Sequence, residues 1–300
     1  MAAAPLSDLP TADVLAIAAH RDDVEQTCGG TLLRMASRGL RTAILDLTQG
    51  EAGTRGTPEA RAEEAAQAAR LLGVAWRQAL DLPDGAVENT LENRLKIVRV
   101  LRLLRPRVVI LPYWQARHPD HAITAALGYG ACFLSGLAKV DTQAAKQRLP
   151  AKGTGFSPYI KPSNSTRASA PEGGSSEYSP KMSPPPQAHA DGQLSLLESM
   201  PHRPFKIVYA SLYADVRPSF IVDISPFIEQ RHAALMAYHS QYANQPAGSA
   251  LFVPEEEIRE RTFAEARHYG LLAGVRYGEP FVQKEVGLVD DLTLLPVQSL

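Results

Sequence analysis

The sequence is poor in cysteine: its 300 residues contain only Cys28 and Cys132. Both lie among apolar residues and neither has a CxxC partner, so we expect buried free thiols rather than a thiolate metal site. No run approaches about 18 uncharged apolar residues, which argues against a transmembrane helix. The opening MAAAPLSDLP lacks the basic start and apolar core of a secretory signal. We therefore expect a cytoplasmic protein.

The chain also lacks an excess of charge of either sign. Its formal net charge is −1, and the basic residues are scattered. Such a chain has no overall field that attracts nucleic acid or an anionic membrane, so we expect neither as a partner. The GxGxxG fingerprint does not follow the first predicted strand, which argues against a Rossmann dehydrogenase.

Apolar runs alternate with segments of helical periodicity through the first 140 residues. Strands are predicted at 13–19, 41–48, 77–82 and 107–113, and helices at 24–39, 58–73, 91–104 and 121–137. This alternation predicts an α/β, Rossmann-like three-layer fold with a mostly parallel sheet. In such sheets, sites form beyond the carboxyl ends of the strands.

The amino-acid composition changes in the second half of the chain. Residues 150–204 hold ten of the 23 prolines, so we expect a disordered insertion at about 141–204, which cannot bury enough apolar surface to offset its ordering entropy. Order is expected to resume with strands at 205–215 and 219–225 and helices at 226–242 and 254–278. One domain over residues 1–282, with a tail over 283–300, is the expected organisation.

Two polar clusters follow predicted strands at what should be the same edge of the sheet. AAHRDD follows the first strand, and RHPDH, residues 117–121, follows the fourth. His20 and Asp23 stand three apart at a helix start, so both can face one point, which His121 could also reach. Two histidines and a carboxylate that leave a fourth position open are typical of catalytic zinc. Bound Zn²⁺ lowers the pKa of its water from about 15.7 toward 7.

The other residues of these clusters suit proton transfer. Asp22 points elsewhere from the same turn as Asp23 and can accept the proton of the water. His118 can stabilise an oxyanion or protonate a leaving amine, and Asp120 can orient His118. The alternative is structural: the two adjacent aspartates would cap a helix and interact with its dipole, and the histidines would be ordinary loop residues.

The combination of AHRDD, VE…GG and RHPDH resembles the LmbE-like (PIG-L) family of zinc-dependent N-deacetylases. Further segments, among them LPD, VDIS, AYHSQY and GVRYGEPF, are similar to the branch that deacetylates N-acetylglucosaminyl malate in bacillithiol biosynthesis. The resemblance covers about residues 12–140 and 205–282. Carried over by motif, the resemblance implies that the zinc ligands are His20, Asp23 and His121. It implies that Asp22 is the general base and that His118 and Asp120 form the charge-stabilising pair.

The resemblance also implies substrate-binding residues. Arg61 falls where this branch places an arginine for the substrate carboxylates, and a guanidinium can bind the two carboxylates of malate bidentately. Arg117, beside the site, is a second candidate. Each has a structural alternative: Arg61 could pair with Glu64 on a solvated helix face, and Arg117 could be a surface residue. Arg21 replaces the proline of the commonest family motif, and we expect it to point to solvent, away from Asp22.

The expected function is removal of the N-acetyl group from N-acetyl-α-D-glucosaminyl L-malate, a small molecule, by a zinc enzyme. Fe²⁺ suits the same ligands, since affinity order alone does not decide which metal is bound. The resemblance further implies a homo-oligomer, a trimer or a hexamer. A deacetylase for another GlcNAc glycoside and an amidase for a thiol conjugate remain open. A doubly wound binding protein with a relic metal site is the non-enzymatic alternative, which metal analysis would distinguish.

Overall fold

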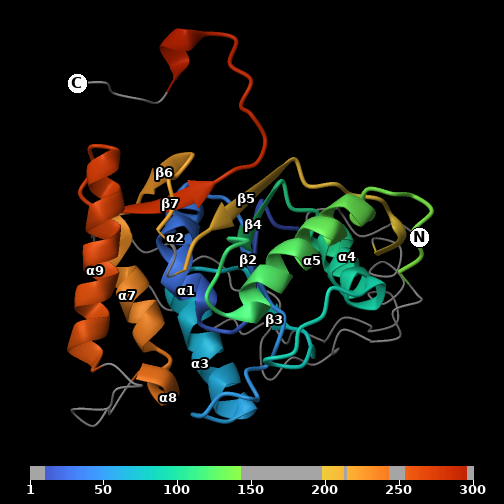
Figure 1. Ribbon diagram of the computed structural model, residues 1–300, viewed down its shortest axis with the longest axis horizontal. Helices are drawn as coiled ribbons and strands as arrows, with labels where there is room; N and C mark the ends of the chain where they lie inside the picture. Colours follow the sequence, from blue (N-terminus) through green and yellow to red (C-terminus); the bar gives the residue numbers. More distant parts are fainter. Residues whose placement is uncertain (1–10, 143–197, 213–214, 243–253, 296–300) are drawn as a thin grey trace, which may run out of the picture.

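The computed structural model describes residues 11–142, 198–212, 215–242 and 254–295. Within these ranges the chain forms a seven-stranded sheet in the order β3-β2-β1-β4-β5-β7-β6. The strands are β1 (Val14–Ala18), β2 (Thr42–Asp46), β3 (Trp76–Ala79), β4 (Val108–Pro112), β5 (Lys206–Ala210), β6 (Phe220–Asp223) and β7 (Gly278–Val282). The sheet lies between helices, as Figure 1 shows.

The helices before the insertion are α1 (Asp23–Thr27), α2 (Gly29–Ser37), α3 (Pro58–Leu71), α4 (Leu91–Leu104) and α5 (Pro119–Ser135). Those after it are η2 (Ser225–Phe227), α7 (Ile228–Met236), α8 (His239–Tyr242), α9 (Glu255–Leu272) and η3 (Leu292–Leu294). Helix α3 begins where predicted because Thr57 caps it, accepting from the Ala60 N–H, and Pro58 occupies the first turn. Thr90 caps α4 in the same way.

The sheet is mostly parallel, as predicted. Strands β3, β2, β1, β4 and β5 pair in parallel, whereas β7 is antiparallel to both β5 and β6. All five residues of β1 and of β2 are buried, as expected for central parallel strands covered on both faces. The α/β fold class is therefore confirmed.

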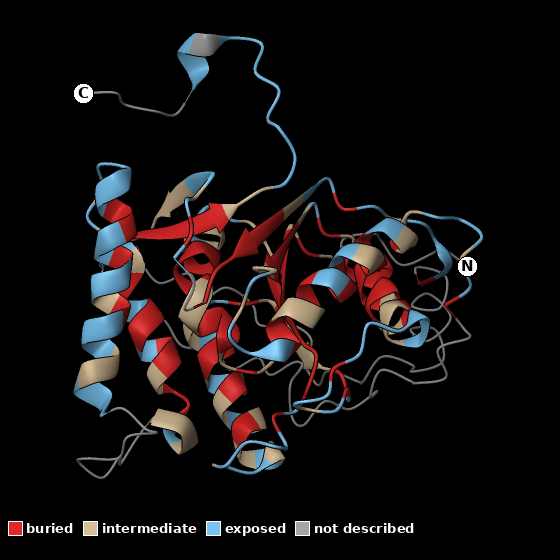
Figure 2. Cartoon of the chain, viewed as in Figure 1, coloured by how far each residue is buried: buried red, intermediate tan, exposed pale blue. Residues whose placement is uncertain are grey.

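Alternate residues of β1 enter two different apolar layers. Leu15 and Ile17 belong to a cluster with side chains of α4 and α5, while Val14 and Ala16 belong to one with side chains of α2. Figure 2 shows the result: a buried sheet whose covering helices are exposed on their outer faces. Burying a Leu or Ile side chain contributes roughly 1.5–3 kcal/mol, so these two layers hold the strand ends in place.

Three helix predictions were wrong in their extent. The segment 226–242 forms α7 and α8, which are separated by Ala237 and Tyr238. The segment 24–39 forms two helices, α1 and α2, because the backbone breaks at Cys28 (φ −143°). The break exposes N–H groups at the start of α2, and the buried carboxylate of Glu279 accepts from Gly30 and Thr31. The segment 254–278 is helical only to Leu272; Gly274 (φ +70°) follows, and the unpredicted strand β7 begins at Gly278.

The predicted insertion lies mainly outside the described residues, but its flanks meet. Thr142 Oγ1 donates to the Glu198 carbonyl at 3.4 Å, and Arg102 donates to the carbonyls of Val140 (3.0 Å) and Glu198 (3.3 Å). Arg102 lies in the last turn of α4, so the flanks join the fold at the amino edge of the parallel strands. That edge is opposite the one where a site is expected.

Both cysteines are buried free thiols, as predicted. In the described parts of the chain, no helix is both long and apolar enough to cross a membrane.

Candidate active site

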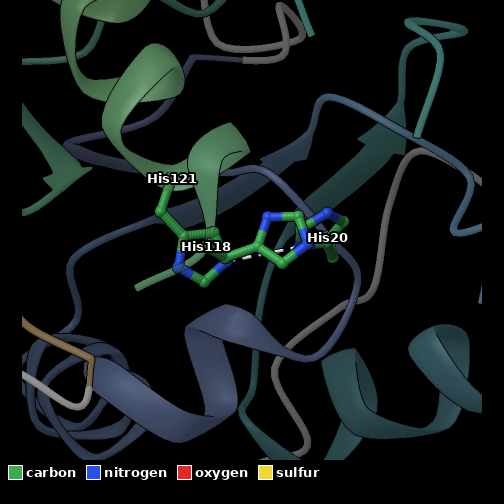
Figure 3. Close-up of side chains that lie close together, drawn as sticks. All are labelled: His20, His118 and His121. Carbon is green, nitrogen blue, oxygen red and sulfur yellow. Dashed lines mark hydrogen bonds between the residues drawn. The ribbon is translucent and has the colours of Figure 1, made fainter. Parts of the chain in front are cut away.

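Two turns meet at the carboxyl edge of the sheet. Strands β1 and β4 are neighbours in register, with Val14 opposite Val108 and Ala16 opposite Ile110. The turn after β1 therefore lies beside the turn after β4, which leads into α5. Figure 3 shows the consequence: His20 lies together with His118 and His121, which follow it in the chain by about 100 residues. The His20 ring centroid is 4.7 Å from that of His118 and 5.3 Å from that of His121.

The structure brings the three predicted ligands together. His121 Nε2 lies 3.2 Å from Asp23 Oδ1 and 3.3 Å from His20 Nδ1. His20 Nδ1 lies 3.5 Å from Asp23 Oδ2. Two imidazole nitrogens and one carboxylate thus converge on one point, the donor set that suits Zn²⁺ and Fe²⁺. The nitrogens of His20, His118 and His121 also lie within 4.8 Å of one another.

The charges around this point favour a cation. Burial raises the pKa of Asp23, but hydrogen bonds from His121 and His20 outweigh it and hold that pKa well below its usual range. Burial lowers the pKa of His20, but the hydrogen bond and charge of Asp23, with the charge of Asp84, outweigh it and raise that pKa to about 9. The cluster therefore stabilises positive charge beside Asp23, on an imidazole or on a metal ion.

The far side of His20 faces two carboxylates. His20 Nε2 lies 3.1 Å from Asp84 Oδ1 and 3.3 Å from Asp120 Oδ2. A carboxylate behind an imidazole fixes its ring and tautomer, which directs Nδ1 toward Asp23 and His121. Sequence reasoning missed Asp84, although its LPD turn follows β3 and so reaches the same sheet edge.

The predicted contact of the Asp120 carboxylate with His118 was wrong. The carboxylate accepts from the N–H groups of Gly85 (2.8 Å) and Val87 (3.3 Å) and lies against His20. The link to His118 runs instead from the Asp120 N–H to His118 Nδ1 (3.2 Å), because His118 is the N-cap of α5. A neutral His118 whose Nδ1 accepts must carry its proton on Nε2.

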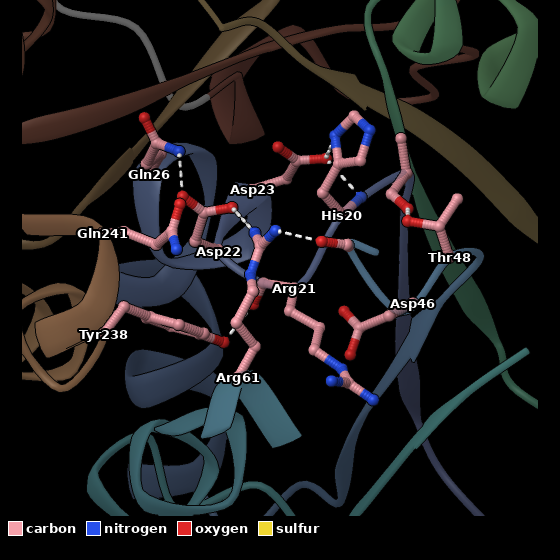
Figure 4. Close-up of polar contacts among 12 residues, drawn as sticks. His20, Arg21, Asp22, Asp23, Gln26, Asp46, Thr48, Arg61, Tyr238 and Gln241 are labelled. Atoms are coloured by element: carbon pink, nitrogen blue, oxygen red, sulfur yellow. Dashed lines mark hydrogen bonds and ion pairs between the residues drawn. The ribbon is translucent and has the colours of Figure 1, made fainter. Parts of the chain in front are cut away.

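Asp22 points away from the convergence point, as predicted. Its Oδ2 accepts from Tyr242 Oη (2.5 Å) and Gln26 Nε2 (3.2 Å), and its Oδ1 lies 3.5 Å from Arg61 Nη2. Figure 4 shows Asp22 with Gln26 and Arg61, next to Asp23. Tyr242 was missed because AYHSQY served only as evidence of resemblance; its register on a separate short helix, α8, could not be predicted.

Arg61 lies at the floor of the site and is not solvated. It is 5% exposed and donates to the Gly50 carbonyl at 3.0 Å. A side chain at Gly50, which has φ +76°, would collide with the guanidinium, so glycine is required there. The alternative pairing with Glu64 was wrong, since that carboxylate accepts from the N–H and hydroxyl of Ser240.

Arg21 is buried, contrary to expectation. It is 7% exposed, and its Nη1 donates to the Pro58 carbonyl at 2.5 Å. Its own carbonyl accepts from Arg77 Nη2 and Tyr238 Oη. The side chain points away from Asp22, as Figure 4 shows, and reaches the Pro58 carbonyl at the start of α3.

A second, closed cluster of charges lies beside this turn. Arg77 donates to Glu25 Oε1 at 2.6 Å and, through two nitrogens, to Asp46 at 2.9 and 3.0 Å. The three side chains are at most 5% exposed. Burial raises the pKa of Glu25 to about 7 although Arg77 opposes the shift.

The convergence point opens to a cleft of about 410 Å³. Its polar lining includes Asp22, Arg61, Asp84, Arg117, His118 and Gln241. Arg117 and His118 are exposed at its mouth. The volume and the polar lining fit a small polar molecule.

Comparisons with known proteins find several similar chains. A family model described as "PIG-L: GlcNAc-PI de-N-acetylase" matches residues 15–132, which include both polar turns. Diacetylchitobiose deacetylase of Thermococcus kodakarensis is 36% identical over 134 residues, 41% of this chain and 50% of that protein. The chain thus spans about half the length of that curated relative. The uncharacterized deacetylase YaiS of Escherichia coli K12 is 32% identical over 131 residues, 40% of this chain and 67% of that protein.

One similar solved structure extends the likeness across the chain. The conserved protein TT1542 of Thermus thermophilus is 34% identical, with a TM-score of 0.67. The match covers 93% of this chain and 98% of that one.

Proposed function

Because the chain belongs to the PIG-L family, we propose that it is a metal-dependent hydrolase that removes the N-acetyl group from an N-acetylglucosaminyl conjugate. The observation that carries this proposal is the convergence of His20, Asp23 and His121 at the base of an open cleft, with Asp22 beside them. These residues fit a divalent ion, Zn²⁺ or Fe²⁺, through two imidazoles and one carboxylate. Such an ion supplies Lewis-acid polarisation of the amide carbonyl and lowers the pKa of an attacking water.

The proton transfers fall to the chain's own carboxylate and imidazole. Asp22 is the proposed general base, and the hydrogen bonds from Tyr242 and Gln26 orient its carboxylate at the cleft wall. His118 is the proposed oxyanion-stabilising residue. Burial and the charges of His20 and His121 lower its pKa, so its neutral form, with the proton on Nε2, prevails at neutral pH. An N–H donor at the cleft mouth can stabilise the developing oxyanion, and the proton that Asp22 accepts from the water can pass to the leaving amine.

Asp120 has a different proposed role from the one expected from sequence. Its carboxylate contacts His20, so it positions a ligand, while its backbone N–H fixes the His118 tautomer. The residue therefore still supports His118, but through the main chain.

The proposed substrate is N-acetyl-α-D-glucosaminyl L-malate, the substrate that the sequence resemblance implies. Two arginines support it: Arg61 at the floor of the cleft and Arg117 at its mouth. Arg61 is only 5% exposed, whereas Arg117 is exposed, so Arg117 is the better placed to bind a malate carboxylate. The proposal includes a homo-oligomer that acts in the cytoplasm.

A second candidate substrate is N,N′-diacetylchitobiose. The 36%-identical relative from Thermococcus kodakarensis carries that substrate in its name. The sugar has no carboxylate, so the two arginines distinguish the candidates.

Acetate release tests the proposal directly. The purified chain would be assayed on the malate glycoside, an inositol glycoside and diacetylchitobiose, after chelation and after readdition of Zn²⁺ or Fe²⁺. We expect metal-dependent acetate release, and the Arg117→Ala variant should raise KM for the malate glycoside but not for diacetylchitobiose. Arg38→Ala, at an exposed arginine beyond α2, is the matched control. A metal-loaded chain that hydrolyses none of the three would overturn the proposal and favour a binding protein.

A further inference from the structure

The segment that follows β7 carries an apolar surface far from the cleft. Residues 286–295, the C-terminal arm, extend away from the body of the molecule in Figure 1 and are coloured as exposed in Figure 2 wherever they are described. Val286 is 97% and Leu288 92% exposed. Of fourteen exposed large apolar side chains in the described ranges, eight lie on this arm or in the groove at its base: Tyr129, Phe133, Phe205, Val286, Leu288, Val289, Leu294 and Leu295. This concentration points to a binding surface, since isolated exposed apolar residues are ordinary.

The groove at the base of the arm is larger than the active-site cleft. Its volume is about 560 Å³, against about 410 Å³ for the cleft. It lies between the second half of α5 (Tyr129, Phe133), the start of β5 (Phe205, Ile207) and the first residues of the arm. The active site is at the opposite end of α5, so the groove belongs to a separate surface.

One wall of the groove is an open sheet edge. The ladder between β5 and β7 contains only the pairs Tyr209–Val282 and Ala210–Phe281 in the described residues. Residues 206–208 of β5 therefore extend beyond the ladder and line the groove. An open edge next to apolar side chains is a suitable place for an extended segment to add as a strand.

The root of the arm is fixed in place by an aromatic cage. The Lys284 ammonium lies 4.7 Å from the Trp114 ring centroid, 4.9 Å from that of Tyr129 and 4.8 Å from that of Tyr209. Three cation–π contacts hold the chain at this point. Residues 285–288, just beyond Lys284, line the groove, and the rest of the arm extends away from the body of the molecule (Figure 1).

The charges of arm and groove are complementary. The arm carries Asp290 and Asp291, both exposed. The charged residues that line the groove are Arg203, Lys206 and Glu285, which leave it with a net positive charge, and the Arg203 guanidinium carbon lies 4.9 Å from the Phe133 ring centroid. An acidic, apolar arm thus matches a basic, apolar groove on the same chain.

We propose that the C-terminal arm binds in the groove of a second copy of this chain, with reciprocal exchange of arms. Because the root of the arm is fixed, the arm of one molecule can bind the matching groove only on another copy of the chain. Because the root also lines the groove, the two exchanged arms run side by side, which a two-fold axis permits. This interface is independent of the proposed catalytic function.

The mass of the assembly in solution tests whether the arms are exchanged between copies. We expect the full chain to form an assembly with an even number of copies in sedimentation velocity. Leu288→Asp on the arm and Phe133→Asp in the groove should each halve its mass. Both side chains are exposed in the single chain, at 92% and 56%, so the fold should survive, as circular dichroism would verify. Leu91→Asp is the matched control: Leu91 is 61% exposed and opens α4, where an acidic residue is favourable, and the mass should not change.

Cross-linking then identifies the partner surface. A photoreactive phenylalanine analogue at position 288 of an unlabelled chain would be mixed and co-refolded with an isotope-labelled chain. We expect cross-links from position 288 to labelled peptides that contain Phe133 or Phe205. A monomeric wild-type chain, an unchanged mass of the Leu288→Asp variant, or cross-links confined to one chain would each overturn the proposal.

Discussion

The turn between β1 and α1 separates two clusters built from similar residues. On one side His20, Asp23 and His121 converge at the base of a cleft. On the other, Arg77 is buried between Glu25 and Asp46. In the closed cluster Arg77 contacts both carboxylates, and among these side chains Glu25 Oε2 alone is buried without a hydrogen-bond partner. In the open cluster the lone pairs of two imidazole nitrogens and one carboxylate point at one another, an arrangement that a cation stabilises. The difference teaches that convergence of acceptors, rather than burial of charge, marks the binding site.

The closed cluster nevertheless helps to position the residues of the open cluster. Arg77 and Tyr238 both donate to the Arg21 carbonyl, which belongs to the peptide that precedes Asp22. Strand β3 and the α7–α8 connection thereby hold the turn from which Asp22 and Asp23 project. The two clusters should consequently respond differently to substitution, one in chemistry and the other in stability.

The largest expected effect is on catalysis, through Asp22. Asp22→Asn keeps the shape of the side chain but removes the basic oxygen, so kcat should fall by about 10²- to 10⁴-fold. Metal content, measured by elemental analysis, should stay at the wild-type level because Asp22 lies outside the donor set. Full turnover in this variant would show that another group accepts the proton.

Breaking the closed cluster should affect stability rather than chemistry. Arg77→Met leaves Glu25 and Asp46 buried without their partner, which should lower the free energy of unfolding by about 3–5 kcal/mol. Urea unfolding measures this change. Arg38→Met, at an exposed position, should alter it by less than about 0.5 kcal/mol. Adding Glu25→Gln to Arg77→Met should restore part of the loss, and strictly additive losses would contradict the assigned pairing.

The carboxylates behind His20 should have a smaller effect, on metal affinity. Asp84→Asn weakens the contact that fixes the His20 ring, so the dissociation constant for Zn²⁺ should rise about 10- to 100-fold. Asp81→Asn, three residues earlier and exposed, is the control and should leave affinity unchanged. Equal affinities of the two variants would remove Asp84 from the site.

The smallest expected effect belongs to Tyr242. Tyr242→Phe removes one hydrogen bond to the Asp22 carboxylate, which should cost about 1.5 kcal/mol and lower kcat about tenfold. Tyr277→Phe, a half-buried tyrosine outside the cleft, should leave kcat unchanged. A tenfold change in the control would mean that loss of a hydroxyl acts through the fold.

The parallel part of the sheet was predictable because its signals are local. Buried runs such as VLAIA at β1 and TAILD at β2 alternate with capped helices, and strand ends reveal where polar turns gather. The strand β7 was not predictable, since GEPFV is short, contains proline and begins only five residues after a long helix. The strands that pair with β7 are far away in sequence. The carboxylate of Glu279 on β7 binds the N–H groups of helix α2 and makes no contribution to the pairing of the strand.

The site was predictable where chemistry is concentrated in adjacent residues and not where it depends on distant packing. His20, Asp22, Asp23 and His121 stand in two short motifs that parallel strands bring together. Asp84 and Tyr242 arrive from separate segments, and each gives a weak signal by itself. The direction of Arg21 was missed for a similar reason: its burial depends on α3 and on the donors from Arg77 and Tyr238.

The most direct test of the central claim is a calorimetric Zn²⁺ titration of the metal-free chain and of two histidine variants. The wild-type chain should bind one ion per chain, His121→Ala should abolish that binding, and His118→Ala should retain it. The distinction matters because all three histidine rings lie within 5.3 Å of one another, whereas only His20 and His121 also contact Asp23. Wild-type affinity in His121→Ala, or its loss in His118→Ala, would contradict the assigned metal centre.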